Sequence, residues 1–193
     1  MANNLTLEDI NNLYFWATKL EEKPINDSSY ENIESKEDIL NLTCITARNS
    51  LPKEVFKLNR LEILDIQVED LTELPKEIGN LNNLESLCIR CPNLKELPKE
   101  IGNLNNLESL IIECPNLNEL PKEIGNLNNL GELQIYCHNL KELPKEIWNL
   151  SRFEVKFDIK NNNNKELLKY IVDSPNNVNK DVELKIVIKE KKD

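Results

Sequence analysis

The string LPKEIGNLNNL, at residues 74–84, recurs letter for letter at 97–107 and at 120–130, a constant step of 23 residues. Its Leu-Pro-Lys-Glu part extends the series to Leu51 and Leu143. A period of about 20 to 50 residues is typical of solenoid proteins, in which each repeat packs only against its neighbours. We therefore predict a solenoid built from these repeats.

Each repeat contains one segment with the spacing of a strand and one that starts a short helix. Alternate residues of a strand face the same side, so paired apolar residues two apart point inward together. These pairs are Leu64 and Ile66, Leu87 and Ile89, Leu110 and Ile112, and Leu133 and Ile135. The Leu-Pro-Lys-Glu-Ile segment predicts a helical turn, because proline at the first helical position loses no hydrogen bond. Strand, loop and short helix make one turn of the solenoid.

The combined pattern, Leu-x-x-Leu-x-Leu followed by Leu-Pro-x-x-Ile-x-x-Leu, resembles the 23-residue leucine-rich repeats of bacterial proteins and of intracellular Ras-linked scaffold and plant proteins. The resemblance covers residues 37–160, and the Asn, Lys, Ile and Glu usage is typical of a bacterial protein. It implies an α/β fold, a right-handed solenoid whose parallel strands line a concave face while short helices lie outside. It also implies function by binding other proteins.

One position departs from the family pattern. Many members carry an asparagine three residues after the last strand leucine, and its side chain ties successive turns together. Here that slot holds Glu69, Pro92, Pro115 and His138, and the slot before it holds Val68, Cys91, Cys114 and Cys137. The second set points into the core by strand alternation. We expect a column of apolar and thiol side chains in place of the asparagine ladder.

The N-terminal end differs from the middle, because an end repeat would otherwise expose its core to water. Apolar residues recur at spacings of three and four between Leu7 and Leu20, with Thr6 placed as the N-cap. This pattern predicts a capping helix. Residues 39–44 suggest an irregular first repeat, one residue longer than the others.

The C-terminal end predicts a strand, a helix and a second strand. Residues 153–159 and 182–188 alternate apolar and polar side chains, and a helical stretch at 165–172 separates them. Both strands together would bring the sheet to about seven strands. We predict one structural domain, with an N-terminal capping region at 1–36, leucine-rich repeats at 37–160 of which 51–142 are regular, and a C-terminal cap at 161–193.

Charge and composition argue against several classes of partner. The chain has 34 acidic residues against 24 Lys and Arg, a net charge of −10, which repels nucleic acid and anionic membranes. The sequence shows no signal-like start and no run approaching the roughly 18 apolar residues of a membrane span. We expect a cytoplasmic protein whose five cysteines are packed thiols rather than a disulfide framework.

The sequence offers little material for a catalytic or metal site. Cys88 and Cys91 form a C-x-x-C string, but on a strand their thiols face opposite sides, which argues against a redox or zinc centre. His138 is the single histidine, and no phosphate-binding loop accompanies the glycines. We expect no catalytic residue, no metal and no cofactor, and hence a protein that is not an enzyme.

The repeats differ from one another at the outward strand positions, and we predict a partner-binding surface there. These positions hold Asp65, Gln67, Cys88, Arg90, Ile111, Glu113, Gln134 and Tyr136. We expect Ile111 and Tyr136 to be exposed, as interface anchors are. Glu62, Glu85 and Glu108 stack nearby, and facing like charges favour a partner protein with a basic surface. Neutral variation of a solvated face is the alternative interpretation.

We therefore interpret the chain as a non-enzymatic protein–protein interaction module, expected to be a monomer, that binds a partner protein through its concave strand face. Two alternatives stay open at this point. The chain is a regulatory subunit of a phosphatase or small GTPase complex, or it is a bacterial effector that is delivered into a host cell and acts on a host protein. A further alternative is an enzyme whose catalytic domain lies outside this chain.

Overall fold

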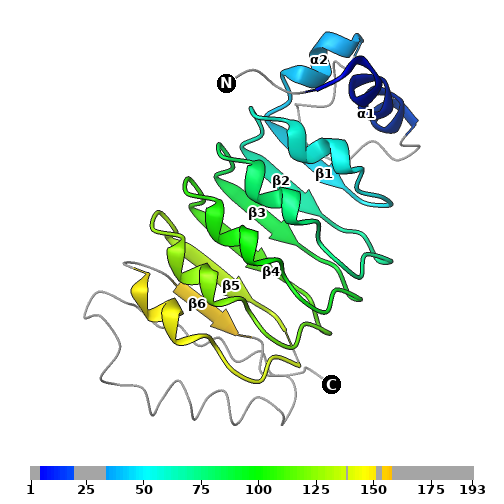
Figure 1. Ribbon diagram of the computed structural model, residues 1–193. Coiled ribbons are helices and arrows are strands. Elements are labelled where there is room, and N and C mark those ends of the chain that lie inside the picture. Colours follow the sequence, from blue (N-terminus) through cyan, green and yellow to red (C-terminus); the bar gives the residue numbers. More distant parts are fainter. Residues whose placement is uncertain (1–4, 20–33, 138, 151–153, 158–193) are drawn as a thin grey trace.

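A parallel sheet is the main organising element of the molecule (Figure 1). The computed structural model describes residues 5–19, 34–137, 139–150 and 154–157. Within them the sheet has six strands, which follow one another in chain order. They are β1 (Cys44–Ala47), β2 (Ile63–Ile66), β3 (Ser86–Ile89), β4 (Ser109–Ile112), β5 (Glu132–Ile135) and β6 (Glu154–Phe157). One parallel strand per repeat is the arrangement predicted for the solenoid.

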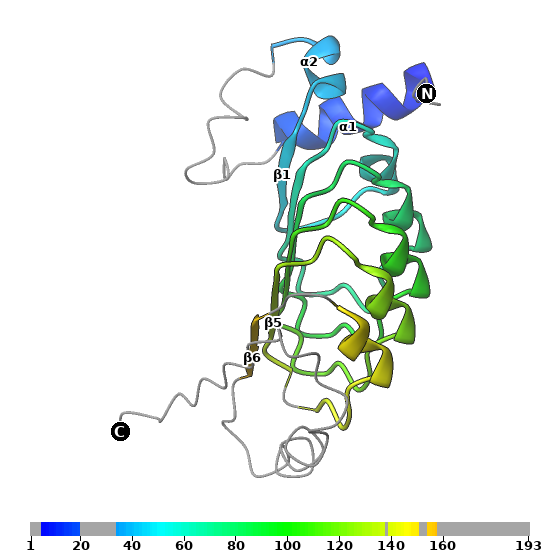
Figure 2. The same cartoon turned by 90° about the vertical axis from the view of Figure 1, so that its left-hand side faces the viewer.

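Short 3-10 helices form a second layer, on the side of the coil opposite the strands (Figure 2). They are η1 (Lys53–Lys57), η2 (Lys76–Asn80), η3 (Lys99–Asn103), η4 (Lys122–Asn126) and η5 (Lys145–Asn149). The repeat proline lies one residue before each helix rather than at its first position, where we expected it. Its carbonyl oxygen accepts the first helical hydrogen bond, as from the N–H of Ile101 to Pro98 at 3.1 Å. The predicted helical turn is therefore confirmed with a slightly later start.

The repeat glycines are required by the close approach of neighbouring 3-10 helices. A Cβ atom added to Gly79 would lie 2.6 Å from the carbonyl oxygen of Glu100 in the next repeat. Gly102 and Gly125 approach the following repeat in the same way. The flanking repeats carry Phe56 and Trp148 at the equivalent position, and both side chains are buried. Side-chain bulk is thus accommodated only at the two ends of the helical layer.

An asparagine ladder joins the repeats in the loop between each helix and the next strand. The side-chain amide of Asn106 donates a hydrogen bond to the carbonyl oxygen of Asn82 at 2.8 Å. The same bond links Asn83 to Asn59 and Asn129 to Asn105, at 2.6 and 2.7 Å. The periodic pattern did not reveal this ladder, although the repeated Asn-Leu-Asn-Asn-Leu string contains it. The asparagines belong to the scaffold.

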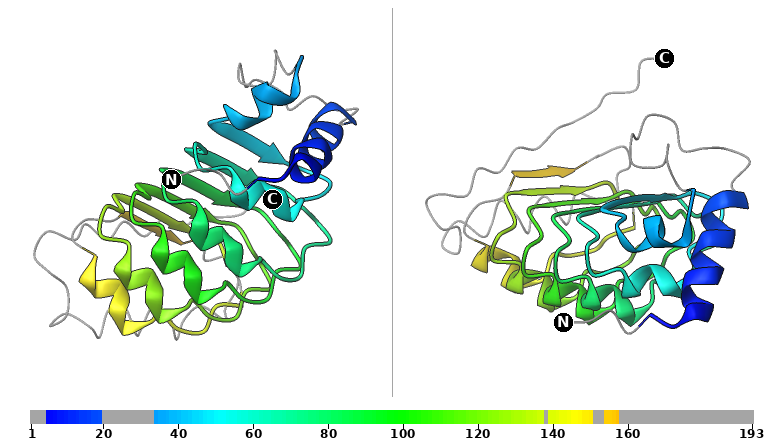
Figure 3. Two further views of the ribbon diagram at one scale, coloured as in Figure 1. Left: turned by 45° about the horizontal axis from the view of Figure 1, so that its top comes forward. Right: turned by 90° about the horizontal axis from the view of Figure 1, so that it is seen from above.

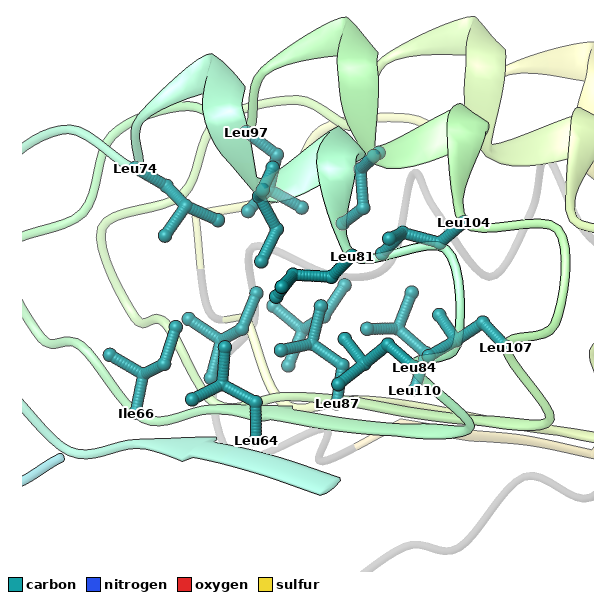
Figure 4. Packing of buried hydrophobic residues seen from close by; sticks show 14 of the residues in the cluster. Leu64, Ile66, Leu74, Leu81, Leu84, Leu87, Leu97, Leu104, Leu107 and Leu110 are labelled. Carbon is teal, nitrogen blue, oxygen red and sulfur yellow. The ribbon is translucent and has the colours of Figure 1, made fainter. Parts of the chain in front are cut away.

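Leucine and isoleucine side chains from the two layers fill the space between them (Figure 4). Leu64, Leu87 and Leu110 are fully buried and lie next to one another because their strands pair at these residues. Leu81 and Leu104 project toward them from the helical side. Full burial of each such side chain contributes about 1.5–3 kcal/mol. The invariant part of the repeat therefore builds a continuous core.

The first repeat is shorter than the others, so our expectation of one extra residue was wrong. Ile45 of β1 pairs with Leu64, and Leu64 pairs with Leu87. Fewer residues separate Ile45 from Leu64 than separate Leu64 from Leu87. The apolar residues that suggested a longer repeat form a short helix instead, α2 (Lys36–Leu40). The carboxylate of Asp38 accepts hydrogen bonds from the backbone and the hydroxyl of Ser35, at 2.7 and 2.9 Å, and fixes the start of this helix.

The predicted N-terminal capping helix is confirmed as α1 (Leu7–Lys19), which lies across the end of the coil beside β1 (Figure 3). Its residue Leu13 is buried in the core. Thr6 and Asp9 form the expected cap, since the Thr6 hydroxyl accepts the N–H of Asp9 and the Asp9 carboxylate accepts the N–H of Thr6. Lys57 of η1 adds an ion pair to Asp9 at 2.8 Å. Lys57 and Thr6 together lower the pKa of Asp9 to about 2.

The predicted first strand of the C-terminal cap is confirmed as β6, which pairs in parallel with β5. Val155 pairs with Leu133 in this register. The expected helix at 165–172, the strand at 182–188 and the resulting seventh strand lie outside the described residues. No helix in the described part of the chain has the length and apolar character needed to cross a membrane.

Candidate partner-binding surface

The strand face turned away from the core carries three rows of side chains. Strand register places Asp65, Cys88, Ile111 and Gln134 side by side in a middle row. Backbone hydrogen bonds continue the pairing past the strand ends, and these place Gln67, Arg90, Glu113 and Tyr136 in an outer row. All eight predicted residues therefore share one face, as expected from strand alternation.

The sequence pattern did not reveal the third row or the contribution of β1. Ile63, Ser86, Ser109 and Glu132 pair with one another at the start of the strands and form a first row. In β1, Thr46 pairs with Asp65 of the middle row. The irregular length of the first repeat hid β1, because the regular period of the other repeats does not lead to it. The first row was overlooked because two of its four members are serines that repeat.

Arg90 holds the acidic residues of the outer face together. Its guanidinium donates to both carboxylate oxygens of Asp65, at 2.9 and 2.8 Å, and lies 3.5 Å from a carboxylate oxygen of Glu113. Gln67 donates a further hydrogen bond to Asp65 at 2.8 Å. Arg90 lies in the repeat between these two carboxylates, and its positive charge offsets the charges of Asp65 and Glu113.

A second polar network occupies β4 and β5. The Ser109 hydroxyl donates to the carboxylate of Glu132 at 3.1 Å, and the Gln134 amide donates to the other oxygen of the same carboxylate. The Tyr136 hydroxyl in turn donates to the amide oxygen of Gln134 at 2.9 Å. The four side chains hold one another in fixed orientations, so this part of the surface is organised before any partner arrives.

Three predicted contact residues are less accessible than expected. Cys88 is 8% exposed, and its burial beside the charge of Asp65 raises the pKa of its thiol to about 12. Ile111 and Tyr136 are half-buried rather than exposed, because neighbouring strands bring other side chains against them. Among the described side chains of this face, Ile63 is the exposed large apolar one, at 44%. An exposed thiol at Cys88 is thus excluded, and Ile63 joins the candidate contacts.

The predicted cysteine column is confirmed and makes a specific contact. Cys91, Cys114 and Cys137 are buried, and each thiol donates to a carbonyl oxygen of the preceding strand. The acceptors are Ile66, Ile89 and Ile112, at 3.7, 3.5 and 3.8 Å. Burial raises the pKa values of all three thiols, to about 12 for Cys114 and Cys137. All five cysteines are free, and His138 lies outside the described residues.

A row of exposed glutamates borders the strand face. Glu62, Glu85 and Glu108 directly precede β2, β3 and β4 and are named here the glutamate row. Each carbonyl oxygen accepts two N–H groups of the next repeat, as Glu62 does from Glu85 and Ser86 at 2.8 and 2.9 Å. No carboxylate of the row forms an ion pair with another described residue. Within the described part of the chain, the negative charge of this row is therefore not offset by a salt bridge.

The fold defines a class, the parallel-sheet solenoid with one strand per repeat. The leucine-rich repeat region family matches residues 39–115, and this part of the chain belongs to that family. A leucine-rich-repeat protein of Leptospira interrogans is similar in structure, with 32% identity, a TM-score of 0.56 and coverage of 80% of this chain. This chain spans 39% of that protein's length.

A second similar structure is the leucine-rich-repeat domain of the type III effector XopL. It shares 21% identity, with a TM-score of 0.32, over 74% of this chain and 78% of that domain. A comparison with curated protein sequences gives no match.

Proposed function

We propose that this protein binds a partner protein through its concave strand face. Leucine-rich-repeat domains commonly serve as protein-interaction modules. The observation that carries the proposal is the contrast between the two layers. The helical side repeats the same residues, whereas the strand face presents different side chains fixed by two hydrogen-bonded networks. A varied and preorganised surface on a uniform scaffold is suited to one specific partner.

A basic partner surface fits this face best. Arg90 offsets the charges of Asp65 and Glu113, so these two carboxylates do not need a cationic group from the partner. The glutamate row, in contrast, has no counterion among the described residues. Opposite charge on the partner would speed encounter and set its orientation. We assign the basic surface of the partner to the edge where the strands begin.

We also propose that the protein has no active site and that it is located in the cytoplasm. Proteins of this family are typically non-enzymatic scaffolds. Five free, buried thiols suit a reducing compartment such as the cytoplasm.

The test is affinity capture from cell extract with matched variants. The site variant is the triple substitution R90E, E113K and Y136A. The control variant is K76E and K99E, on the exposed helical side. We expect the native protein and the control to retain the same partner and the site variant to lose it. Thermal unfolding of all three proteins checks that they are folded.

Calorimetry with the purified partner then measures the dependence on salt. Affinity is expected to fall as the ionic strength rises, because screening weakens contacts to exposed glutamates. Retention of the partner by a folded site variant, or an affinity independent of salt, would contradict the proposal. The identity of the partner separates an enzyme of the same cell, as expected for a regulatory subunit, from a foreign target, as expected for an effector.

A further inference from the structure

Arg90 uses only part of its guanidinium in contacts within the described chain. The arginine side chain carries five N–H donors, one on Nε and two on each terminal nitrogen. Nη1 donates to both carboxylate oxygens of Asp65, and Nε faces a carboxylate oxygen of Glu113. Nη2 forms no hydrogen bond or ion pair with a described residue. Because the side chain is 37% exposed, the N–H groups of Nη2 are available to another molecule.

The charges around Arg90 determine which acceptor suits these N–H groups. One guanidinium lies beside the two carboxylates of Asp65 and Glu113, so the group as a whole is negative. The net charge of the chain, −10, has the same sign. An incoming carboxylate would be attracted by Arg90 and repelled by its two carboxylate neighbours, so its charge would gain it little. An uncharged carbonyl oxygen accepts the same N–H groups without this repulsion.

An apolar spot adjoins Arg90 on the same face. Cys88 and Ile111 are neighbours in the middle row, because β3 and β4 pair at these residues. Ile111 is half-buried, so part of its side chain reaches the surface. The network of Arg90 borders the spot on one side, and the network that contains Gln134 borders it on the other. An apolar centre with a polar border is typical of the residues that anchor an interface.

We propose that Arg90 and Ile111 together bind a backbone amide of the partner and the aliphatic side chain next to it, as at a leucine. This inference rests on the partner-binding function proposed above and names the contact at the centre of the strand face. Nη2 of Arg90 would donate to the amide oxygen, and the aliphatic side chain would pack on Ile111. The basic surface of the partner, in contrast, faces the glutamate row at the edge of the sheet.

The test uses Nα-acetyl-leucine N-methylamide as the probe and the full chain labelled with 15N. We expect saturable shifts of the amide signals of Cys88, Arg90 and Ile111. Nα-acetyl-glycine N-methylamide lacks the aliphatic side chain and is expected to bind about tenfold more weakly. Nα-acetyl-leucine carries a carboxylate in place of one amide and is expected to bind about threefold more weakly, because Asp65 and Glu113 repel it.

Two variants separate hydrogen bonding from apolar packing. Arg90→Lys keeps the positive charge beside Asp65 but lacks Nη2, so it is expected to weaken both amide compounds about fivefold. Ile111→Thr keeps the branched shape but removes apolar surface, so the preference for the leucine amide over the glycine amide should fall from about tenfold to about threefold. Lys99→Ala, on the exposed helical side, is the control and should change neither affinity. Thermal unfolding checks that all variants are folded.

Several outcomes would overturn the inference: tighter binding of the carboxylate compound, native affinity in Arg90→Lys, or shifts that spread over the surface without saturation. The result also distinguishes this contact from the wider function. If the leucine amide does not bind at Arg90 while the triple variant of the strand face still loses its partner, this inference fails and the proposed function stands. If the leucine amide binds there and the triple variant keeps its partner, the assignment of the partner to the strand face fails instead.

Discussion

The thiol of Cys114 donates a hydrogen bond to the carbonyl oxygen of Ile89, 3.5 Å away on the neighbouring strand. The same relationship joins Cys91 to Ile66 and Cys137 to Ile112, so one column of thiols ties consecutive turns together. A thiol is a weaker donor than the amide of asparagine. The cysteine column therefore forms weaker hydrogen bonds than asparagine amides would, but its side chains pack in the core as apolar groups.

Removal of one thiol from the column tests this contribution. Cys114→Ala is expected to lower the free energy of unfolding by about 1–2 kcal/mol, because it leaves a small cavity and an unpaired carbonyl. Cys114→Val fills the volume without donating, and we expect a smaller loss. Urea unfolding of the three proteins measures both effects. Equal stability of the native protein and the alanine variant would show that the column contributes nothing.

The thiols are expected to be unreactive in the folded protein. A pKa of about 12 for Cys88, Cys114 and Cys137 reduces the thiolate fraction at pH 8 by about a thousandfold relative to a free cysteine. A colorimetric thiol reagent should therefore label the protein slowly, and should label all five cysteines once urea unfolds it. Rapid labelling of one thiol under native conditions would contradict the burial of that side chain.

Two glycines at different positions of the repeat, Gly102 in η3 and Gly131 before β5, are expected to respond oppositely to alanine. Gly102→Ala forces a Cβ atom against the carbonyl of Glu123 and should cost about 3 kcal/mol through strain between the helices. Among the described residues, Gly131→Ala has room for the methyl group, and it should stabilise the fold by about 0.5 kcal/mol. Thermal unfolding of the pair measures the difference. Similar effects at both sites would refute the assignment of Gly102 to the scaffold.

The N-terminal cap is expected to weaken in acid. Lys57 and Thr6 lower the pKa of Asp9 to about 2 in the folded chain, so the unfolded chain takes up a proton more readily. The stabilisation is complete above the ordinary carboxyl pKa and is lost as the pH falls through about 2. The unfolding free energies of the native protein and of Asp9→Asn should be compared between pH 6 and 2. The difference between the two proteins should shrink as the pH falls over this range. Lys57→Met should move that window to higher pH.

The sequence predicted the scaffold because the scaffold repeats. A period of 23 residues placed the strand leucines, the helical turns and the inward cysteines correctly. The period failed at the first repeat, where Ile39 belongs to α2 and β1 follows after a shorter step. Local helix capping by Ser35 and Asp38 decided that segment, and no periodic signal could reveal it.

The candidate surface was predicted by position but not by accessibility. Strand alternation identified the correct face, yet it carries no information on how far neighbouring side chains cover one another. Cys88 was therefore expected at the surface, although it is buried between adjacent strands. The compensation of Asp65 by Arg90 also depends on side-chain conformation, which spacing alone does not determine. Position follows from periodicity, whereas exposure follows from packing.

The close approach of glycine to the next repeat has a consequence for how this chain can change in length. Gly79, Gly102 and Gly125 make the same contact, so an interior repeat meets identical neighbours on either side. A duplication or deletion of 23 residues within the interior would rejoin matching surfaces and preserve both caps. The strand face can thus grow or shrink by whole strands, about 4.8 Å at a time. Such a change would lengthen or shorten the surface available to a partner, while the packing between neighbouring repeats would stay the same.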